Sequence, residues 1–240
     1  MNIETALASF DERLVVPLFA DITRTLEVTC HKPGPDNHGS NFVGNGVVLS
    51  GIETVAQFTD PTTDADRPSF VTEARNCYAS LDASVKQYVS PRYSPIDGSL
   101  LAQEFMRDYF SDPIAQGKEL GVPLRQLIWA FRNPHLHAFY PYYQKRFNDK
   151  LIAGAVDWMY LDSTARVGIT ISQLELDFEQ HKHMLYTVEG DSIRICPQIL
   201  FVYFKRAVAA FVVAIHRGGE VQSRFLEKYR SFGCSYGFRL

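Results

Sequence analysis

The run from Leu124 to Phe139 holds the side chains best suited to chemistry. Within it, the six residues from Arg132 to His137 include an arginine, an asparagine and two histidines. Histidine titrates near neutral pH, so it can take a proton from a hydroxyl or return one to a leaving group. Arginine carries a permanent charge on a planar fork that fits phosphate oxygens. These residue types fit the cleavage of a phosphodiester, with Asn133 fixing the backbone or orienting the arginine.

A structural interpretation of the same residues also exists, in which Asn133 caps a helix and the histidines lie on a surface or in the core. Pro134 bears on both interpretations, because it has no N–H and disfavours helical geometry for Asn133. One arrangement ends a helix near Arg132, makes Asn133 an N-cap and puts Pro134 at the first helical position. The unpaired N–H groups of that new turn, beside Arg132, would then suit an anion such as phosphate.

The residues before the cluster predict the helix that must position it. Four apolar side chains recur at the spacing of a buried helical stripe: Leu124, Leu127, Ile128 and Phe131. If this helix continued without interruption at about 100° per residue, His135 would fall on the buried stripe and His137 on the opposite face. His137 is therefore the preferred acid/base of the two histidines.

The segment from Arg132 to His137 resembles the signature of the HEPN superfamily, the higher eukaryotes and prokaryotes nucleotide-binding domains. That signature is an arginine, often followed by a polar residue such as asparagine, with a histidine four to six residues after the arginine. It sits late in an all-helical bundle, and here several predicted helices come before it. The resemblance covers roughly residues 4 to 145 and the helix after Pro197, and it leaves residues 151 to 195 as a β-sheet insertion.

The resemblance implies a metal-independent endoribonuclease, often a toxin or antiphage effector, without a cofactor. In such an enzyme the ribose 2′-hydroxyl attacks the adjacent phosphate and leaves a cyclic phosphate end. His137 would be the acid/base and Arg132 the phosphate clamp, with Asn133 in support. The implied partners are RNA, a second copy in a homodimer whose motifs face one another, and an antitoxin or regulatory protein. Members that only bind RNA or nucleotide, and members that only dimerise, remain alternatives.

Further side chains near the motif are candidates for binding the substrate. Tyr140 could stack on a base, Lys145 and Arg146 could hold backbone phosphates, and His135 lies within the motif itself. The residues alone favour a different interpretation of the aromatic and basic run around Tyr140, as a half-buried helix end. Glu53 is either a buried carboxylate near the site or the exposed side of its own helix.

A metal site is not predicted. His135 and His137, like His181 and His183, form H-x-H pairs that could present two ligands to one ion. Neither Asp177 nor another residue completes such a pair at a diagnostic spacing. The sequence also has no glycine-rich phosphate loop and no nucleophile elbow.

Composition predicts a soluble cytoplasmic protein with no membrane partner. The chain has 240 residues, 46% hydrophobic and 21% charged, with a net charge of −3, so RNA would have to be held by a local basic patch. The four scattered cysteines fit a reducing compartment. The N-terminus lacks the layout of a signal peptide. The apolar run Phe201 to Ile215 is too short to span a bilayer and contains Lys205 and Arg206.

The pattern of the whole chain predicts one mainly α domain over residues 1–240, a HEPN-like bundle with a small antiparallel sheet inserted before its last helices. Helices are predicted at 4–31, 43–58, 69–89, 100–110, from 124 onward, 201–215 and 220–232. Strands are predicted at 157–161, 166–171, 184–188 and 192–195.

Overall fold

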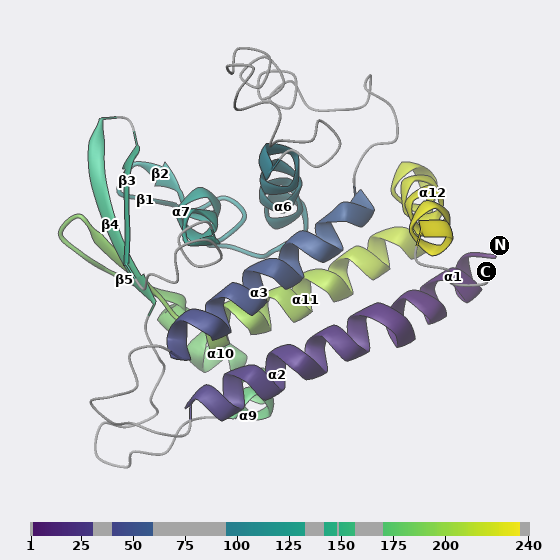
Figure 1. The fold of residues 1–240 in the computed structure, drawn as a ribbon, viewed down its shortest axis with the longest axis horizontal. Helices are drawn as coiled ribbons and strands as arrows, with labels where there is room; N and C mark the ends of the chain where they lie inside the picture. The colour runs from purple at the N-terminus through teal and green to yellow at the C-terminus, as the bar shows by residue number, and fades with distance from the viewer. Residues whose placement is uncertain are drawn as a thin grey trace.

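Helices dominate the computed structural model, which confirms a mainly α fold. The residues that it describes are 2–30, 40–59, 95–132, 142–147, 149–156 and 170–235. Three long helices, α2 (Val16–Cys30), α3 (Ser40–Ala56) and α11 (Pro197–His216), run along the molecule, with a sheet at one end and α12 (Gly219–Ser235) at the other (Figure 1). The predicted helix at 69–89 and strand at 157–161 lie outside the described residues.

The first predicted helix, 4–31, forms with one irregular turn. Helix α1 (Ile3–Phe10) passes through a π-helical turn at Asp11–Val15 into α2. Pro17 follows this turn, and its ring would clash with the carbonyl four residues earlier in a regular helix. In the π turn the N–H of Val16 bonds instead to the carbonyl of Asp11, five residues back. The wider turn lets the proline stay inside a continuous helical segment.

The second predicted helix, 43–58, is confirmed as α3 with a 3-10 turn at Gln57–Thr59. Its glycines do not break it, and the packing of the neighbouring helices requires one of them, Gly51, to lack a side chain. A Cβ on Gly51 would lie 2.9 Å from Cδ1 of Ile22 on α2 and 3.0 Å from Cε1 of Phe204 on α11. Gly51 therefore lets α3 pack closely against both helices.

Helix α6 (Pro95–Tyr109) confirms the helix predicted at 100–110, and a small hairpin then leads into α7 (Leu124–Ala130). The hairpin joins Lys118–Glu119 to Val122–Pro123 through Leu120 and Gly121. Their φ angles of 54° and 79° are the left-handed values that a tight two-residue turn requires. The start of α7 is tied to the preceding loop by a bond from the N–H of Leu124 to the carbonyl of Gly117, 2.9 Å long.

The sheet has four strands in the order β3-β4-β6-β5. The strands are β3 (Tyr142–Phe147), β4 (Lys150–Val156), β5 (Tyr186–Glu189) and β6 (Ser192–Ile195). Each hairpin, β3–β4 and β5–β6, is antiparallel, but β4 and β6 pair in parallel, so the prediction of an antiparallel sheet was wrong at the central pair. Local patterns define hairpins, whereas long-range packing decides how two hairpins join. The sheet also begins at Tyr142, earlier than the predicted residue 151.

The chain between the hairpins is helical where it is described, in α9 (Ile171–Leu176), α10 (Phe178–His181) and a 3-10 turn at Lys182–Leu185. Of the strand predicted at 166–171, the structure describes Thr170 and Ile171. Thr170 is the N-cap of α9 and Ile171 is its first residue, so the prediction was wrong for these two residues. Thr170 caps α9, because its Oγ1 accepts the N–H of Gln173 at 3.2 Å. The predicted strand at 184–188 begins two residues late, at Tyr186, and the strand at 192–195 is confirmed.

Helix α11 is the central core helix and confirms the helix predicted at 201–215. By length and composition alone, its 20 residues could cross a membrane, but 56% of its apolar window is buried inside the protein. Its buried side chains include Phe201, Tyr203, Phe204, Val208, Phe211 and Ile215. The same core extends without interruption into the sheet through Ile152, Ile193 and Ile195.

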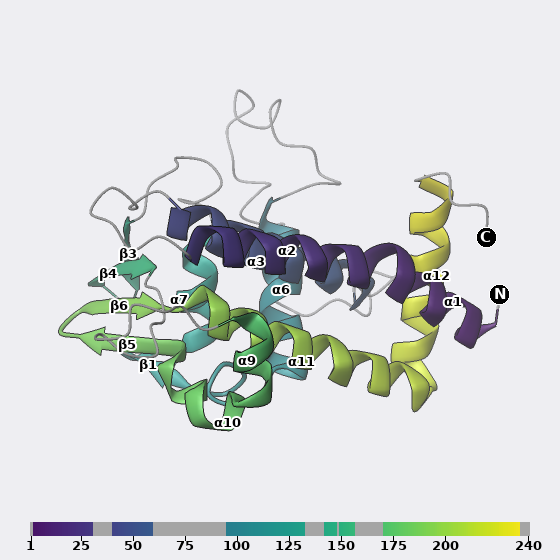
Figure 2. The same cartoon turned by 90° about the horizontal axis from the view of Figure 1, so that it is seen from below.

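Helix α12 confirms the last predicted helix and packs across α1 at the far end of the bundle, as both views show (Figures 1 and 2). The hydroxyl of Tyr229 donates to Oγ of Ser9 at 2.5 Å. Beneath this bond, the ring of Phe225 meets that of Phe10 edge to face, with centroids 5.3 Å apart. The first and last helices therefore close the core together.

Candidate functional site

Helix α7 presents Arg132 at the end of a firmly buried stripe. The predicted stripe is confirmed, since Leu124, Leu127, Ile128 and Phe131 are all at most 1% exposed. Phe131 directly precedes the arginine, and its ring fills the space above Gly154 of β4, where any Cβ would collide with it. The backbone that carries Arg132 is thus anchored against the sheet.

Glu53 of α3 holds the guanidinium of Arg132. Its Oε2 accepts Nη2 of Arg132 at 2.7 Å and Nε at 3.1 Å. The two side chains are 16% and 22% exposed, so the pair lies at the edge of the core and still reaches solvent. A charge-assisted contact of this kind is stronger than a fully exposed ion pair because water screens it less. The contact joins residues 79 positions apart in the sequence.

Trp129 provides a second contact for the same guanidinium. The central carbon of the Arg132 guanidinium lies 5.9 Å from the centroid of the Trp129 ring, within the range of a cation–π interaction. Trp129 is itself only 5% exposed. The arginine is therefore held by a carboxylate and by an indole that is fixed in the core.

The other predicted motif residues cannot be placed. Asn133, Pro134, His135, His137 and Tyr140 lie outside the described residues. The proposed helix start at Pro134 therefore stays a prediction. Of the predicted catalytic residues, the structure places Arg132.

Lys145 and Arg146 lie in strand β3, so the interpretation of this run as a helix end was wrong. Strand β3 pairs with β4 along its whole length, and this pairing outweighs the local tendency to form a helix. Tyr142, Tyr143 and Phe147 are also residue types that are common in strands. Both cationic side chains are exposed. The ammonium of Lys145 lies 5.5 Å from the ring centroid of Phe147, two residues further along the same face.

The two cations point to opposite faces of the sheet, because successive strand residues alternate. Lys145 pairs with Ile152, which is fully buried. Gly154 shares that face, two residues further along β4, and it is the residue that contacts Phe131. Arg146 pairs instead with Leu151, which is 50% exposed. Of the two cations, Lys145 therefore lies on the face of the sheet against which Phe131, the neighbour of Arg132, packs.

A hydrogen bond from the sheet to the hairpin of β1 (Lys118–Glu119) and β2 (Val122–Pro123) supports this arrangement. The hydroxyl of Tyr186 on β5 donates to Oε1 of Glu119 at 2.6 Å. Burial, together with this carboxylate, raises the pKa of Tyr186 to about 12. The bond fixes the hairpin from which α7 starts against the sheet that receives Phe131.

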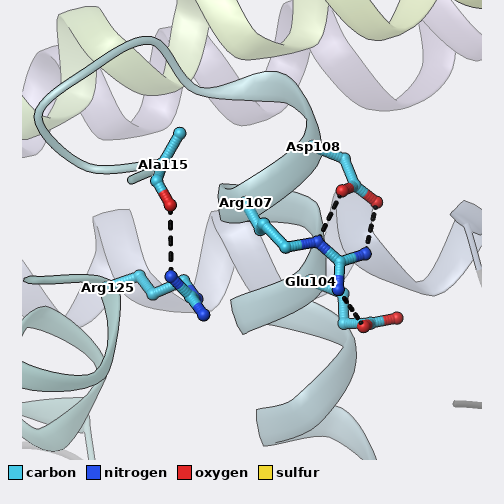
Figure 3. Close-up of polar contacts among 5 residues, drawn as sticks. All are labelled: Glu104, Arg107, Asp108, Ala115 and Arg125. Atoms are coloured by element: carbon cyan, nitrogen blue, oxygen red, sulfur yellow. Dashed lines mark hydrogen bonds and ion pairs between the residues drawn. The ribbon is translucent and has the colours of Figure 1, made fainter. Parts of the chain in front are cut away.

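A second group of charged side chains lies on α6 and α7 (Figure 3). Arg107 donates from Nη1 to Glu104 at 2.8 Å and from Nε and Nη2 to Asp108 at 2.7 and 3.0 Å. Arg125, on α7, donates to the carbonyl of Ala115 at 3.1 Å. Burial raises the pKa of Glu104, and the nearby Arg107 opposes that rise. These contacts are local to α6 and the start of α7.

The other H-x-H pair ends a short helix. His181 closes α10 and His183 lies in the following 3-10 turn. Nearby, Glu179 accepts a hydrogen bond from Lys182, and this bond lowers the pKa of the carboxyl. Within the part of the chain that the structure describes, no three His, Cys, Asp or Glu side chains gather as metal ligands.

Glu53 is the site residue that the sequence left undecided between two interpretations. A signal for it was present, because Glu53 is the one charged residue in the sequence of Ser40–Ala56. A single carboxylate in an apolar helix needs a partner when its helix is packed on several sides. The sequence could not name that partner across 79 residues.

Comparison with known proteins adds no relative: no family model, no curated protein and no solved structure matches this chain.

Proposed function

We propose that this protein is a metal-independent endoribonuclease of the HEPN type, in which the described helices form a HEPN-like bundle. The observation that carries the proposal is the guanidinium of Arg132, which is partly exposed and held in place directly before Asn133 and His137. A fixed guanidinium that is partly exposed can bind a phosphate group and stabilise the charge that develops on it. The sequence supplies the histidine five residues later.

In the proposed reaction, Arg132 binds the scissile phosphate, and His137 takes the proton of the ribose 2′-hydroxyl as that oxygen attacks phosphorus. The bond from phosphorus to the 5′ oxygen of the next nucleotide then breaks. A cyclic phosphate and a free 5′-hydroxyl are the products, and a protonated histidine supplies the proton of the leaving oxygen. The enzyme is proposed to act in the cytoplasm as a homodimer, because one arginine and one histidine are few groups for a complete site.

Lys145 is the second phosphate-binding residue in this proposal. It lies on the Arg132 side of the sheet, whereas Arg146 lies on the other side. An RNA strand that passes Arg132 along β3 would meet the ammonium of Lys145 and not the guanidinium of Arg146. This difference makes Arg146 a matched control of equal charge.

The test is incubation of the purified protein with single-stranded and hairpin RNAs in EDTA, beside Arg132→Ala and His137→Ala. We expect cleavage with cyclic phosphate ends in the wild type and a loss of about a hundredfold or more in each variant. Cleavage that survives both substitutions, or no cleavage of any RNA, would contradict the nuclease mechanism.

RNA binding measured against salt concentration separates the alternatives. Lys145→Ala should weaken binding and reduce the salt slope by about one, while Arg146→Ala should change neither. Binding that depends on Arg132 and Lys145 without any cleavage would identify a non-catalytic RNA-binding module. Absence of both binding and cleavage would leave the structural dimerisation protein as the better interpretation.

A further inference from the structure

Two contacts on different sides define the orientation of the Arg132 guanidinium. Glu53 binds the side edge of the guanidinium, because Nε and Nη2 of Arg132 both donate to Oε2 of Glu53. Trp129 lies against the group at 5.9 Å. An arginine side chain otherwise has many rotamers, so many orientations of the guanidinium compete. The bonds of Glu53 select among them.

The carboxylate of Glu53 is itself rigidly mounted. Its chain neighbour Ile52 and the nearby Val55 are fully buried, and two residues earlier Gly51 brings α3 against α2 and α11. Glu53 therefore lies on a helix that packs closely against two neighbouring helices. A group at this position can fix the direction of an arginine more firmly than a surface carboxylate can.

We infer that Glu53 is the positioning residue for Arg132: its carboxylate sets the direction in which the guanidinium meets the phosphate. This inference rests on the proposed function for its catalytic consequence. Glu53 bonds Nε and Nη2, so its carboxylate lies along the side edge of the guanidinium. Neither bond of Glu53 requires it to touch the RNA, so its effect passes entirely through Arg132.

The ion pairs of Arg107 on α6 are arranged differently from the pair of Arg132 and Glu53. Arg107 is 42% exposed and binds carboxylates one and three residues away, so the contacts stay within one helix. Such a pair orients nothing outside its own surface. Glu104 is therefore the matched control for Glu53, since it also accepts an arginine through one carboxylate oxygen.

The experiment compares Glu53→Gln, Glu53→Asp and Glu53→Ala with Glu104→Gln in RNA cleavage, after thermal unfolding has shown that each variant is folded. Misplacement of a phosphate-binding group by about 1 Å can cost a hundredfold in rate. We expect kcat to fall by about ten- to a hundredfold in Glu53→Gln and further in Glu53→Ala, with a smaller change in KM. Glu53→Asp should recover part of the rate, and Glu104→Gln should match the wild type.

A second measurement is independent of cleavage. In protein labelled with ¹⁵N-arginine, the Nε–H signal of Arg132 should be ordered in the wild type and become mobile in Glu53→Gln, with the signal of Arg107 unchanged. An Arg132 signal or a kcat that does not respond to Glu53→Gln overturns the positioning role. A wild type that shows no cleavage, yet has an Arg132 signal dependent on Glu53, refutes the proposed function and retains the positioning.

Discussion

Arg107 on α6 and Arg132, which follows the C-cap of α7, use similar chemistry in opposite ways. Arg107 binds Glu104 and Asp108 on its own helix and stays 42% exposed. Arg132 reaches from the end of α7 to Glu53 on α3 and is 16% exposed. The contacts of Arg107 stay within one helix, while the pair of Arg132 and Glu53 joins two elements and fixes a charge at the edge of the core. The difference lies in burial and in the scaffold beneath each arginine.

The largest expected effect comes from removing that scaffold. Phe131→Ala empties a fully buried space between α7 and β4, and a substitution of this kind costs about 3–5 kcal/mol of unfolding free energy. Urea unfolding followed by circular dichroism measures it. Tyr109→Ala on α6, a partly buried aromatic near Arg107, should cost less; an equal loss would show that Arg132 has no special anchor.

The second effect is the coupling within each pair. A double-mutant cycle with Glu53→Ala and Arg132→Ala should give about 1–2 kcal/mol, between the values for exposed and buried ion pairs. The cycle with Glu104→Ala and Arg107→Ala should give about 0.5 kcal/mol or less. Equal coupling energies would remove the distinction between the two arginines.

The smallest effect is a pH dependence specific to Glu104. Its pKa is raised above the ordinary 4.5, chiefly by burial, so the unfolded chain loses this proton at a lower pH than the folded protein. Stability from this carboxyl is therefore present below pH 4.5 and is lost as pH rises through the folded pKa. Glu104→Gln should flatten that part of the curve in urea unfolding between pH 4 and 7. An unchanged slope would contradict the burial of the carboxyl.

The sequence predicted the long helices among the described residues, and the periodicity of apolar side chains is the main reason. The stripe of α7 from Leu124 to Phe131 is the clearest case, and all four of its side chains are buried. The run before Phe147 shows the opposite, since its strand geometry comes from pairing with β4. Similarly, Thr170 has strand composition but begins a helix, because its hydroxyl caps one.

Of the pair formed by Arg132 and Glu53, the sequence predicted only the arginine as a site residue. Arg132 was found from its chemical type and its place after an apolar helix. Its partner Glu53 is a lone carboxylate in an apolar segment. This pattern indicates that the carboxylate needs a partner, but it does not identify the partner residue. The opposite directions of Lys145 and Arg146 follow from strand alternation, which could be applied only once the strand itself was known.

The packing of α12 across α1 has a consequence for biosynthesis. The bond from Tyr229 to Ser9 and the contact of Phe225 with Phe10 join segments about 220 residues apart, which leave the ribosome at very different times. Helix α11, against which α2 and α3 pack, is also synthesised late. The apolar faces of α2 and α3 therefore stay exposed to solvent during most of translation. Nascent chains stalled before Pro197 should therefore bind chaperones, and release should follow once residues 197–235 are out of the exit tunnel.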